Sequence, residues 1–122
     1  MIKANELRIG NYIYSSITQK YIKVHSRFFR LIESEIRVKG NSTYVGIPLT
    51  EELLLKCGFI NEFEDEEDNS YFTLKNIEIQ KILFKEEFFL DNVNNIGVSI
   101  KHLHQLQNLY FVLTGTELEI KL

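Results

Sequence analysis

The amino-acid sequence predicts an α+β protein that is rich in β-strands. Three observations predict this class: short stretches in which apolar and polar residues alternate, two stretches with helical periodicity and caps, and nine Phe and six Tyr without any Trp. Aromatic rings suit the half-buried face of a pleated sheet, and capped helical stretches interrupt that sheet. We expect a small N-terminal antiparallel, SH3-like barrel, then a short helix, an antiparallel meander, and one longer C-terminal helix packed on the sheet.

Residues 1–47 predict the small barrel-like half. Apolar and polar side chains alternate over 20–26, which is the pattern of a strand with one buried face. Further short strands are expected at 12–14, 28–33, 35–39 and 43–47. Five short strands with turns between them and no helix are typical of a small antiparallel barrel, and the SH3-like barrel is the nearest match in size.

Residues 48–122 predict an α+β half. A helix is expected at 50–57, because Thr50 can cap its first turn and Gly58 can stop its last. The rest of this half predicts a meander over 59–98, a helix over 100–114 and an edge strand over 117–121. The seam between the halves, at 46–49, is too short for a flexible linker, so the two halves can also form one compact unit.

The helix over 100–114 is the most strongly specified element of the chain. Ser99 is placed to cap its first turn, and Gly115 can adopt the left-handed conformation that ends it. Its apolar residues recur at steps of three and four: Ile100, Leu103, Leu106, Tyr110 and Leu113. Three polar residues lie off this stripe: Gln105, Gln107 and Asn108. They can satisfy buried backbone groups or bind a partner, and we favour the first role because buried backbone groups require hydrogen bonds.

Composition and cysteine content predict a soluble cytoplasmic protein. The apolar share of 44% and the charged share of 25% are ordinary for a globular domain. A single cysteine, Cys57, cannot form an internal disulfide, which fits a reducing compartment. The first residues are mixed and polar, and the apolar runs are far shorter than the ~20 residues that cross a bilayer. We therefore expect neither a cleaved signal nor a membrane partner, and the oligomeric state stays open.

The histidines, the cysteine and the acidic run do not predict a catalytic or metal site. His102 and His104 are two residues apart, about 200° around a helix, so we expect them to face apart, with His104 in solvent. Cys57 follows an apolar run and is expected in the core. The acidic run 62–68 lacks the order of a calcium loop and is expected to be a solvated hairpin tip. We expect no catalytic residue, no metal and no cofactor.

The distribution of charge favours a nucleic-acid-binding surface in the N-terminal half. Residues 1–47 hold eight basic and three acidic residues, whereas 48–122 hold six basic and fourteen acidic ones. The candidate binding residues are Tyr21, Lys23 and His25 on the outer face of one strand, and Arg37 and Lys39 on that of another. Aromatic rings beside cations on a small barrel are a common way to hold single-stranded nucleic acid. The alternative is that these cations are merely solvated.

Three blocks of the sequence resemble a family of small uncharacterised proteins frequent in Bacteroides-type genomes, their prophages and mobile elements. The blocks are Lys-Ala-Asn-Glu-Leu-Arg-Ile-Gly-Asn at 3–11, Ile-Pro-Leu-Thr-Glu-Glu with Leu-Leu-Lys-Cys-Gly-Phe at 47–59, and His-Gln-Leu-Gln-Asn-Leu-Tyr-Phe at 104–111. The chain departs from the family pattern at Leu53, where an aromatic is usual, and at Cys57, where Phe is usual. The resemblance implies a phage-like or mobile-element setting and no residue roles.

The function that these features favour is a non-enzymatic binding or regulatory accessory module for another protein or for nucleic acid. The runner-up is a hydrolase or nuclease whose site assembles from distant residues such as His25, His102 and the acidic cluster. A structural component of an oligomer is a third alternative, which would expose a large apolar patch.

Overall fold

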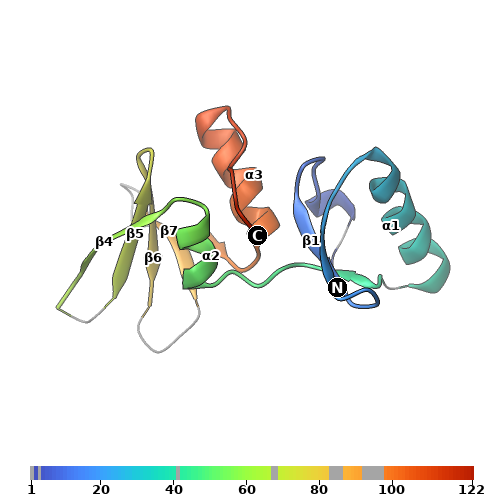
Figure 1. The fold of residues 1–122 in the computed structure, drawn as a ribbon, viewed down its shortest axis with the longest axis horizontal. Helices are drawn as coiled ribbons and strands as arrows, with labels where there is room; N and C mark the ends of the chain where they lie inside the picture. The colour runs from blue at the N-terminus through green and yellow to red at the C-terminus, as the bar shows by residue number, and fades with distance from the viewer. Residues whose placement is uncertain (1, 3, 41, 67–68, 83–86, 92–97) are drawn as a thin grey trace. The chain divides into compact units, whose positions relative to one another are not determined.

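The computed structural model describes residues 2, 4–40, 42–66, 69–82, 87–91 and 98–122 (Figure 1). The chain divides into two compact units. Unit 1 comprises Met1–Pro48 and His102–Glu117, and unit 2 comprises Leu49–Lys101 and Leu118–Leu122. The protein combines helices with antiparallel sheets, as the sequence predicts. No helix within the described residues is long and apolar enough to cross a membrane.

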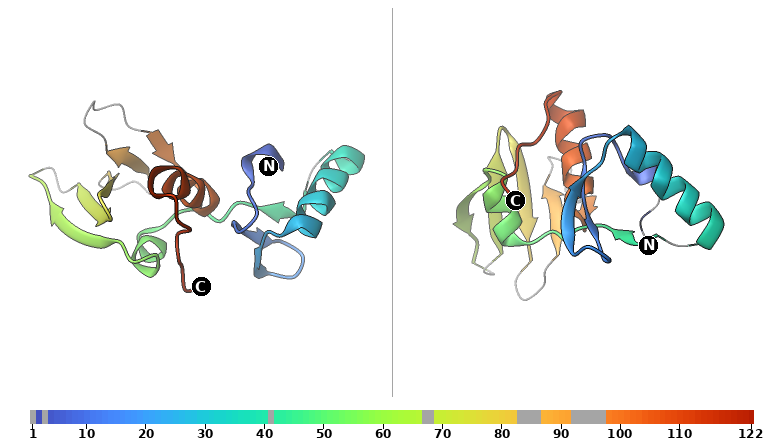
Figure 2. Two further views of the ribbon diagram at one scale, coloured as in Figure 1. Left: turned by 90° about the horizontal axis from the view of Figure 1, so that it is seen from above. Right: turned by 45° about the vertical axis from the view of Figure 1, so that its right-hand side comes forward.

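Unit 1 is a three-stranded antiparallel sheet with two helices. The strands, in the order β2-β1-β3, are Lys20–Lys23, Tyr12–Ser15 and Tyr44–Val45. The other elements of the unit are a 3-10 turn η1 at Ala4–Glu6, helix α1 at Ser26–Lys39 and helix α3 at Leu103–Thr114 (Figure 2). Helix α1 buries Ile32 in a core that also contains Ile13, and Phe29 and Ile36 of the same helix pack against that core. Since Ile13 and Ile22 are paired across β1 and β2, this core lies on one face of the sheet.

The strands predicted at 28–33 and 35–39 are wrong, because these residues form α1. Phe29, Ile32 and Ile36 recur at steps of three and four, so only a helix brings them to one side. The helix is capped at both ends: the His25 side chain accepts a hydrogen bond from the Arg27 backbone N–H, and Gly40 is left-handed with φ 76°. With a helix in place of two strands, the described strands of unit 1 form an open sheet, and the SH3-like barrel is not confirmed.

Unit 2 is a five-stranded antiparallel meander with one short helix. Its strands follow the chain order: β4 Ile60–Glu64, β5 Ser70–Leu74, β6 Ile77–Lys81, β7 Phe88–Asp91 and β8 Val98–Ile100. The observed order of the strands is therefore that of the meander predicted over 59–98. The parts of the predicted strands that fall on 83–86 and 95–97 lie outside the described residues.

Helix α2, Glu51–Lys56, precedes the meander and matches the helix predicted at 50–57. The Thr50 hydroxyl accepts a hydrogen bond from the Leu53 backbone N–H. At the other end, Gly58 has φ 95° and the Phe59 backbone N–H donates to the Leu54 carbonyl at 3.1 Å. This is the left-handed helix end that the glycine predicts.

The C-terminal segment differs from its prediction in three ways. Helix α3 begins at Leu103, because Ser99 and Ile100 belong to β8 and His102 is the N-cap. The helix was predicted with the second half, but it belongs to unit 1, where the Leu103 backbone N–H donates to the Ile47 carbonyl at 2.8 Å. The edge strand predicted at 117–121 is wrong, since these residues, all within the described stretch 98–122, form no strand.

Candidate functional site

The side chain of Gln107 completes the hydrogen bonding of β1. Its Oε1 accepts from the Tyr12 backbone N–H at 2.8 Å, and its Nε2 donates to the Gly10 carbonyl at 3.2 Å. Strand β3 pairs only with Tyr14 and Ser15 of β1, so the edge of β1 before them is open. Gln107, which is 1% exposed, occupies that edge as a neighbouring strand would.

Asn108 joins α3 to the N-terminal turns of unit 1. Its Nδ2 donates to the Glu6 carbonyl at 3.0 Å, and its Oδ1 accepts from Asn11 Nδ2 at 2.8 Å and Arg8 Nε at 3.2 Å. Gln105 acts at the start of the helix, where its Oε1 accepts from the His102 backbone N–H at 3.0 Å. The contacts of all three amides are those of the structural role, in which they satisfy backbone groups.

Arg8 extends this network to the end of α3. Its guanidinium forms an ion pair with Glu117 and lies 4.4 Å from the centroid of the Phe111 ring. The hydrogen bonds from Arg8 hold the pKa of Glu117 below its usual value, and the charges of Arg8 and Lys23 lower it further. Three residues of the block at 3–11, namely Glu6, Arg8 and Asn11, therefore attach α3.

A pocket of about 120 Å³ lies in unit 1 beside the N-terminus of α3. Its lining residues are Ile2, Glu6, Val45, Gly46, His102 and His104. The two histidines do not face apart as predicted: their rings are stacked, with centroids 5.4 Å apart. The 200° rotation assumed that both residues are helical, whereas His102 is an extended N-cap. The prediction that His104 lies in solvent is also wrong, because its side chain is 1% exposed.

Gly46 allows the two rings to lie this close to the backbone. A Cβ at this position would lie 2.7 Å from Cδ2 of His102 and 3.0 Å from Cε1 of His104. Contacts of that length are repulsive, so any larger residue would displace the rings. Glu6 and Gly46 are pocket residues that sequence reasoning missed, since neither stands near the histidines in the sequence.

The pocket holds two imidazole rings and one carboxylate. Nε2 of His104 lies 3.4 Å from Oε2 of Glu6, and Nδ1 of each histidine is buried without a hydrogen-bond partner. Among the residues that the structure describes, no group of three or more His, Cys, Asp or Glu side chains can hold a metal.

The burial of His104 predicts that the protein loses stability in mild acid. Burial is the largest cause that lowers the pKa of His104 below 6.5, and the neighbouring His102 lowers it further, while the hydrogen bond to Glu6 opposes them. The unfolded chain then binds a proton at a higher pH than the folded chain. The free energy of unfolding is therefore expected to fall as pH drops below about 6.5, by at most ~1.4 kcal/mol per pH unit for one group.

Urea unfolding between about pH 7.5 and 5.5 measures this dependence. His104→Asn is expected to flatten the fall, whereas His25→Asn, at an exposed helix cap, is expected to leave it unchanged. An equal slope in the wild type and in His104→Asn would contradict the assignment.

The remaining candidates for chemistry are held in structural roles. Burial raises the pKa of Cys57 to about 12, so its thiol is protonated and a poor nucleophile. His25 caps α1 through Nδ1. In the acidic run, Asp65 accepts hydrogen bonds from the Asn69 backbone N–H and the Tyr71 hydroxyl, which closes the β4–β5 hairpin; 67–68 lie outside the described residues.

The structure brings together only part of the predicted nucleic-acid-binding set. Tyr21 and Lys23 share one face of β2, opposite Tyr14 and Tyr12 of β1. His25 has left the strand, and Arg37 and Lys39 lie in the last turn of α1, not on a strand as predicted. Sequence reasoning missed Tyr12 and Tyr14 as neighbours of Tyr21, and also missed Arg27 and Arg30, whose helical spacing with Arg37 was the available signal.

No protein family, curated protein or solved structure matches this chain. The resemblance to a family of small proteins from Bacteroides-type genomes, prophages and mobile elements therefore stays a prediction.

Proposed function

We propose that the chain is a non-enzymatic binding module whose unit 1 binds single-stranded nucleic acid. The binding surface is the tyrosine face, which we define as Tyr12, Tyr14, Tyr21 and Lys23. It is the face of the β2-β1-β3 sheet opposite to the Ile13 and Ile22 side chains that pack in the core. A free thiol at Cys57 and a nucleic-acid ligand both suit a cytoplasmic setting.

The observation that carries this proposal is the pairing of rings and a cation on the tyrosine face. The rings of Tyr14 and Tyr21 have centroids 5.8 Å apart, and Tyr21 is 53% exposed. Nζ of Lys23 lies 5.8 Å from the centroid of the Tyr12 ring. Rings accept unpaired bases by stacking, and a neighbouring ammonium contacts the phosphates.

The charge of unit 1 supports the same ligand. Unit 1 carries eight Lys or Arg and four Glu, whereas unit 2 carries six Lys and thirteen Asp or Glu. A net positive unit attracts a polyanion at long range, and its binding weakens as salt screens the charges.

The test is fluorescence anisotropy with a labelled oligothymidine of about 12 nucleotides at two salt concentrations. Tyr21→Ala is expected to weaken binding about 5- to 150-fold, the loss of one stacked base at roughly 1–3 kcal/mol. Tyr21→Phe keeps the ring and is the matched control. Lys23→Gln is expected to reduce the slope of log affinity against log salt by about 0.7, the loss of one phosphate contact.

The proposal would be excluded if the protein bound neither the oligothymidine nor a mixed-sequence RNA of equal length at about 50 mM salt. Equal affinity of Tyr21→Ala and Tyr21→Phe would exclude the tyrosine face as the site. Recovery of a stable protein complex in place of nucleic acid would instead favour the protein-binding form of the module.

A further inference from the structure

We propose that the exposed side of helix α1 binds an acidic amphipathic helix of a partner protein. We call this surface the arginine face and define it as Arg27, Arg30, Leu31, Arg37 and Val38. This surface shares no residue with the tyrosine face.

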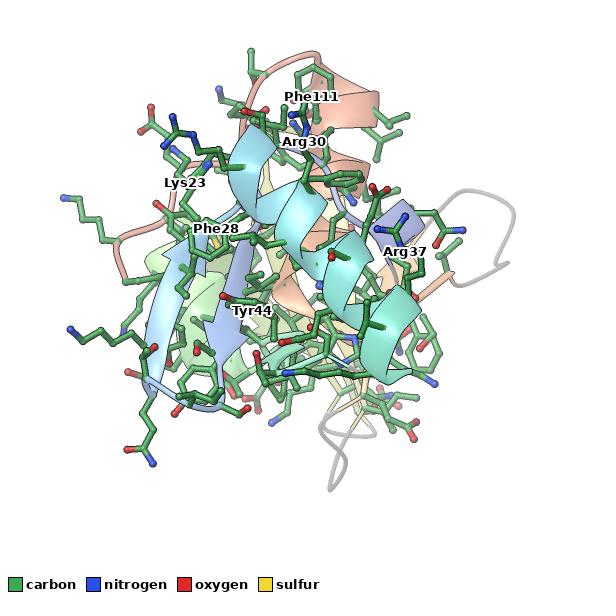
Figure 3. All side chains as sticks on the ribbon, turned by 90° about the vertical axis from the view of Figure 1, so that its right-hand side faces the viewer. Lys23, Phe28, Arg30, Arg37, Tyr44 and Phe111 are labelled. Atoms are coloured by element: carbon green, nitrogen blue, oxygen red, sulfur yellow. The ribbon has the colours of Figure 1, made fainter. Side chains whose placement is uncertain are left out.

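The arginine face lies on the side of α1 away from the core. At 100° per residue, the five positions fall within an arc of about 120°, opposite to Ile32 and Ile36, which pack in or against the core. All five side chains are exposed. Figure 3, in which α1 is turned toward the viewer, labels Arg30 and Arg37 on this helix. At 14 residues, α1 is about 21 Å long and offers nearly four turns for contact.

The arginines of this face are available to an external acid. In the part of the chain that the structure describes, Arg27, Arg30 and Arg37 form no ion pair with a carboxylate. Of the two acids on the helix, Glu35 is engaged by the Thr43 backbone N–H and hydroxyl, which leaves only Glu33 as an exposed acid. Guanidinium groups bind carboxylates by paired hydrogen bonds, so three of them favour an acidic partner.

The aliphatic residues between the arginines distinguish a protein from a nucleic acid. Leu31 is 56% exposed and Val38 is 76% exposed, and the two stand seven residues apart on the same side of α1. A phosphate backbone would pair the arginines but leave both aliphatic side chains in water. A helix with one apolar stripe and flanking carboxylates buries the aliphatic pair and neutralises the arginines together.

The arginine face of a second copy does not fit the same surface. Packing two α1 helices face to face would place arginines against arginines and bring like charges together in a desolvated interface. The occupant that satisfies both the charge and the apolar pair is therefore an acidic amphipathic helix.

The experiment uses the full chain and a fluorescent synthetic peptide of about 21 residues, with leucines at positions i, i+3, i+4 and i+7 and glutamates flanking them. A peptide of the same composition, with its leucines spread around the helix, is the control probe. The amphipathic peptide is expected to bind at least tenfold more tightly than the control peptide by anisotropy.

Substitutions then test each part of the arginine face. The double variant Leu31→Ser and Val38→Ser is expected to weaken peptide binding about tenfold, and Arg27→Gln with Arg37→Gln to weaken it at least as much. Lys39→Gln, an exposed cation on another side of α1, is the matched control and is expected to leave affinity within twofold. Circular dichroism of each variant checks that α1 is retained.

Three outcomes would overturn the proposal: no binding of the amphipathic peptide, equal binding of the two peptides, or an unchanged affinity in the Leu31 and Val38 double variant. Equal binding with loss in the arginine variants, together with competition by duplex DNA, would show a general polyanion surface instead. Tyr21→Ala is expected to leave peptide affinity unchanged, so failure of the tyrosine face and failure of the arginine face are separate results.

Discussion

Gln107→Ala is expected to lower the free energy of unfolding by about 2–3 kcal/mol. The substitution removes the side-chain amide, whose oxygen and nitrogen bond the edge of β1. The Tyr12 N–H and the Gly10 carbonyl then lose these hydrogen bonds. An unsatisfied buried donor or acceptor costs roughly 1–3 kcal/mol. The two costs partly overlap, because the two groups are close together in the chain. Urea unfolding followed by circular dichroism measures the change.

The matched control is Val112→Ala on the same helix. Val112 is 78% exposed, so its truncation is expected to change stability by no more than about 0.5 kcal/mol. If Gln107→Ala and Val112→Ala had equal stability, the amide would not support β1. Unchanged stability together with lost nucleic-acid binding would assign Gln107 to the ligand surface instead.

Phe72→Ala is expected to have the larger effect, about 3–5 kcal/mol. Phe72 lies in β5 of the meander, is fully buried, and pairs across the sheet with Ile79, which is also fully buried. Truncation of such a ring removes its transfer free energy and leaves a cavity among rigid neighbours. Since a whole domain is stable by only about 5–15 kcal/mol, the loss is expected to be visible as a large shift of the urea midpoint.

Two further variants make the Phe72 prediction specific to burial. Ile60→Ala removes an apolar side chain from the neighbouring strand β4, but Ile60 is 65% exposed, so its loss is expected to cost under about 1 kcal/mol. Phe72→Leu keeps most of the volume and is expected to fall between the two. A Phe72→Ala chain as stable as Ile60→Ala would show that this sheet face is not a packed core.

The structure reproduces three predicted helix ends, each marked by a cap or stop residue. Helix α2 is bounded by Thr50 and Gly58, and α3 ends at Gly115, whose φ of 73° is the left-handed conformation expected there. The strands of unit 2 pair in chain order, as the predicted meander requires. Caps reflect hydrogen bonds among near neighbours, so a single sequence carries them.

The errors lie where two local readings competed. Residues 35–39 alternate acidic or basic with apolar residues and fit a strand, yet Phe29, Ile32 and Ile36 fit a helix. The two patterns share Ile36, and the helix is favoured because its face packs with Ile13 and Ile22 of the sheet. This contact joins residues far apart in the chain, which periodicity within one segment cannot describe. As a result, Arg37, one of the predicted nucleic-acid-binding residues, lies on α1 and not on the expected strand.

By itself, the sequence determined the caps of α2, the end of α3, the alternation of the meander, and the presence of three amides on α3 that need a role. Only the tertiary structure decided that α3 belongs to unit 1, that Gln107 serves the edge of β1, and that His104 is buried against Gly46. It also decided that Tyr21 and Lys23 share a face with two more tyrosines. The physical reason is that local hydrogen bonding is encoded within a few residues, whereas burial depends on which distant surface covers each side chain.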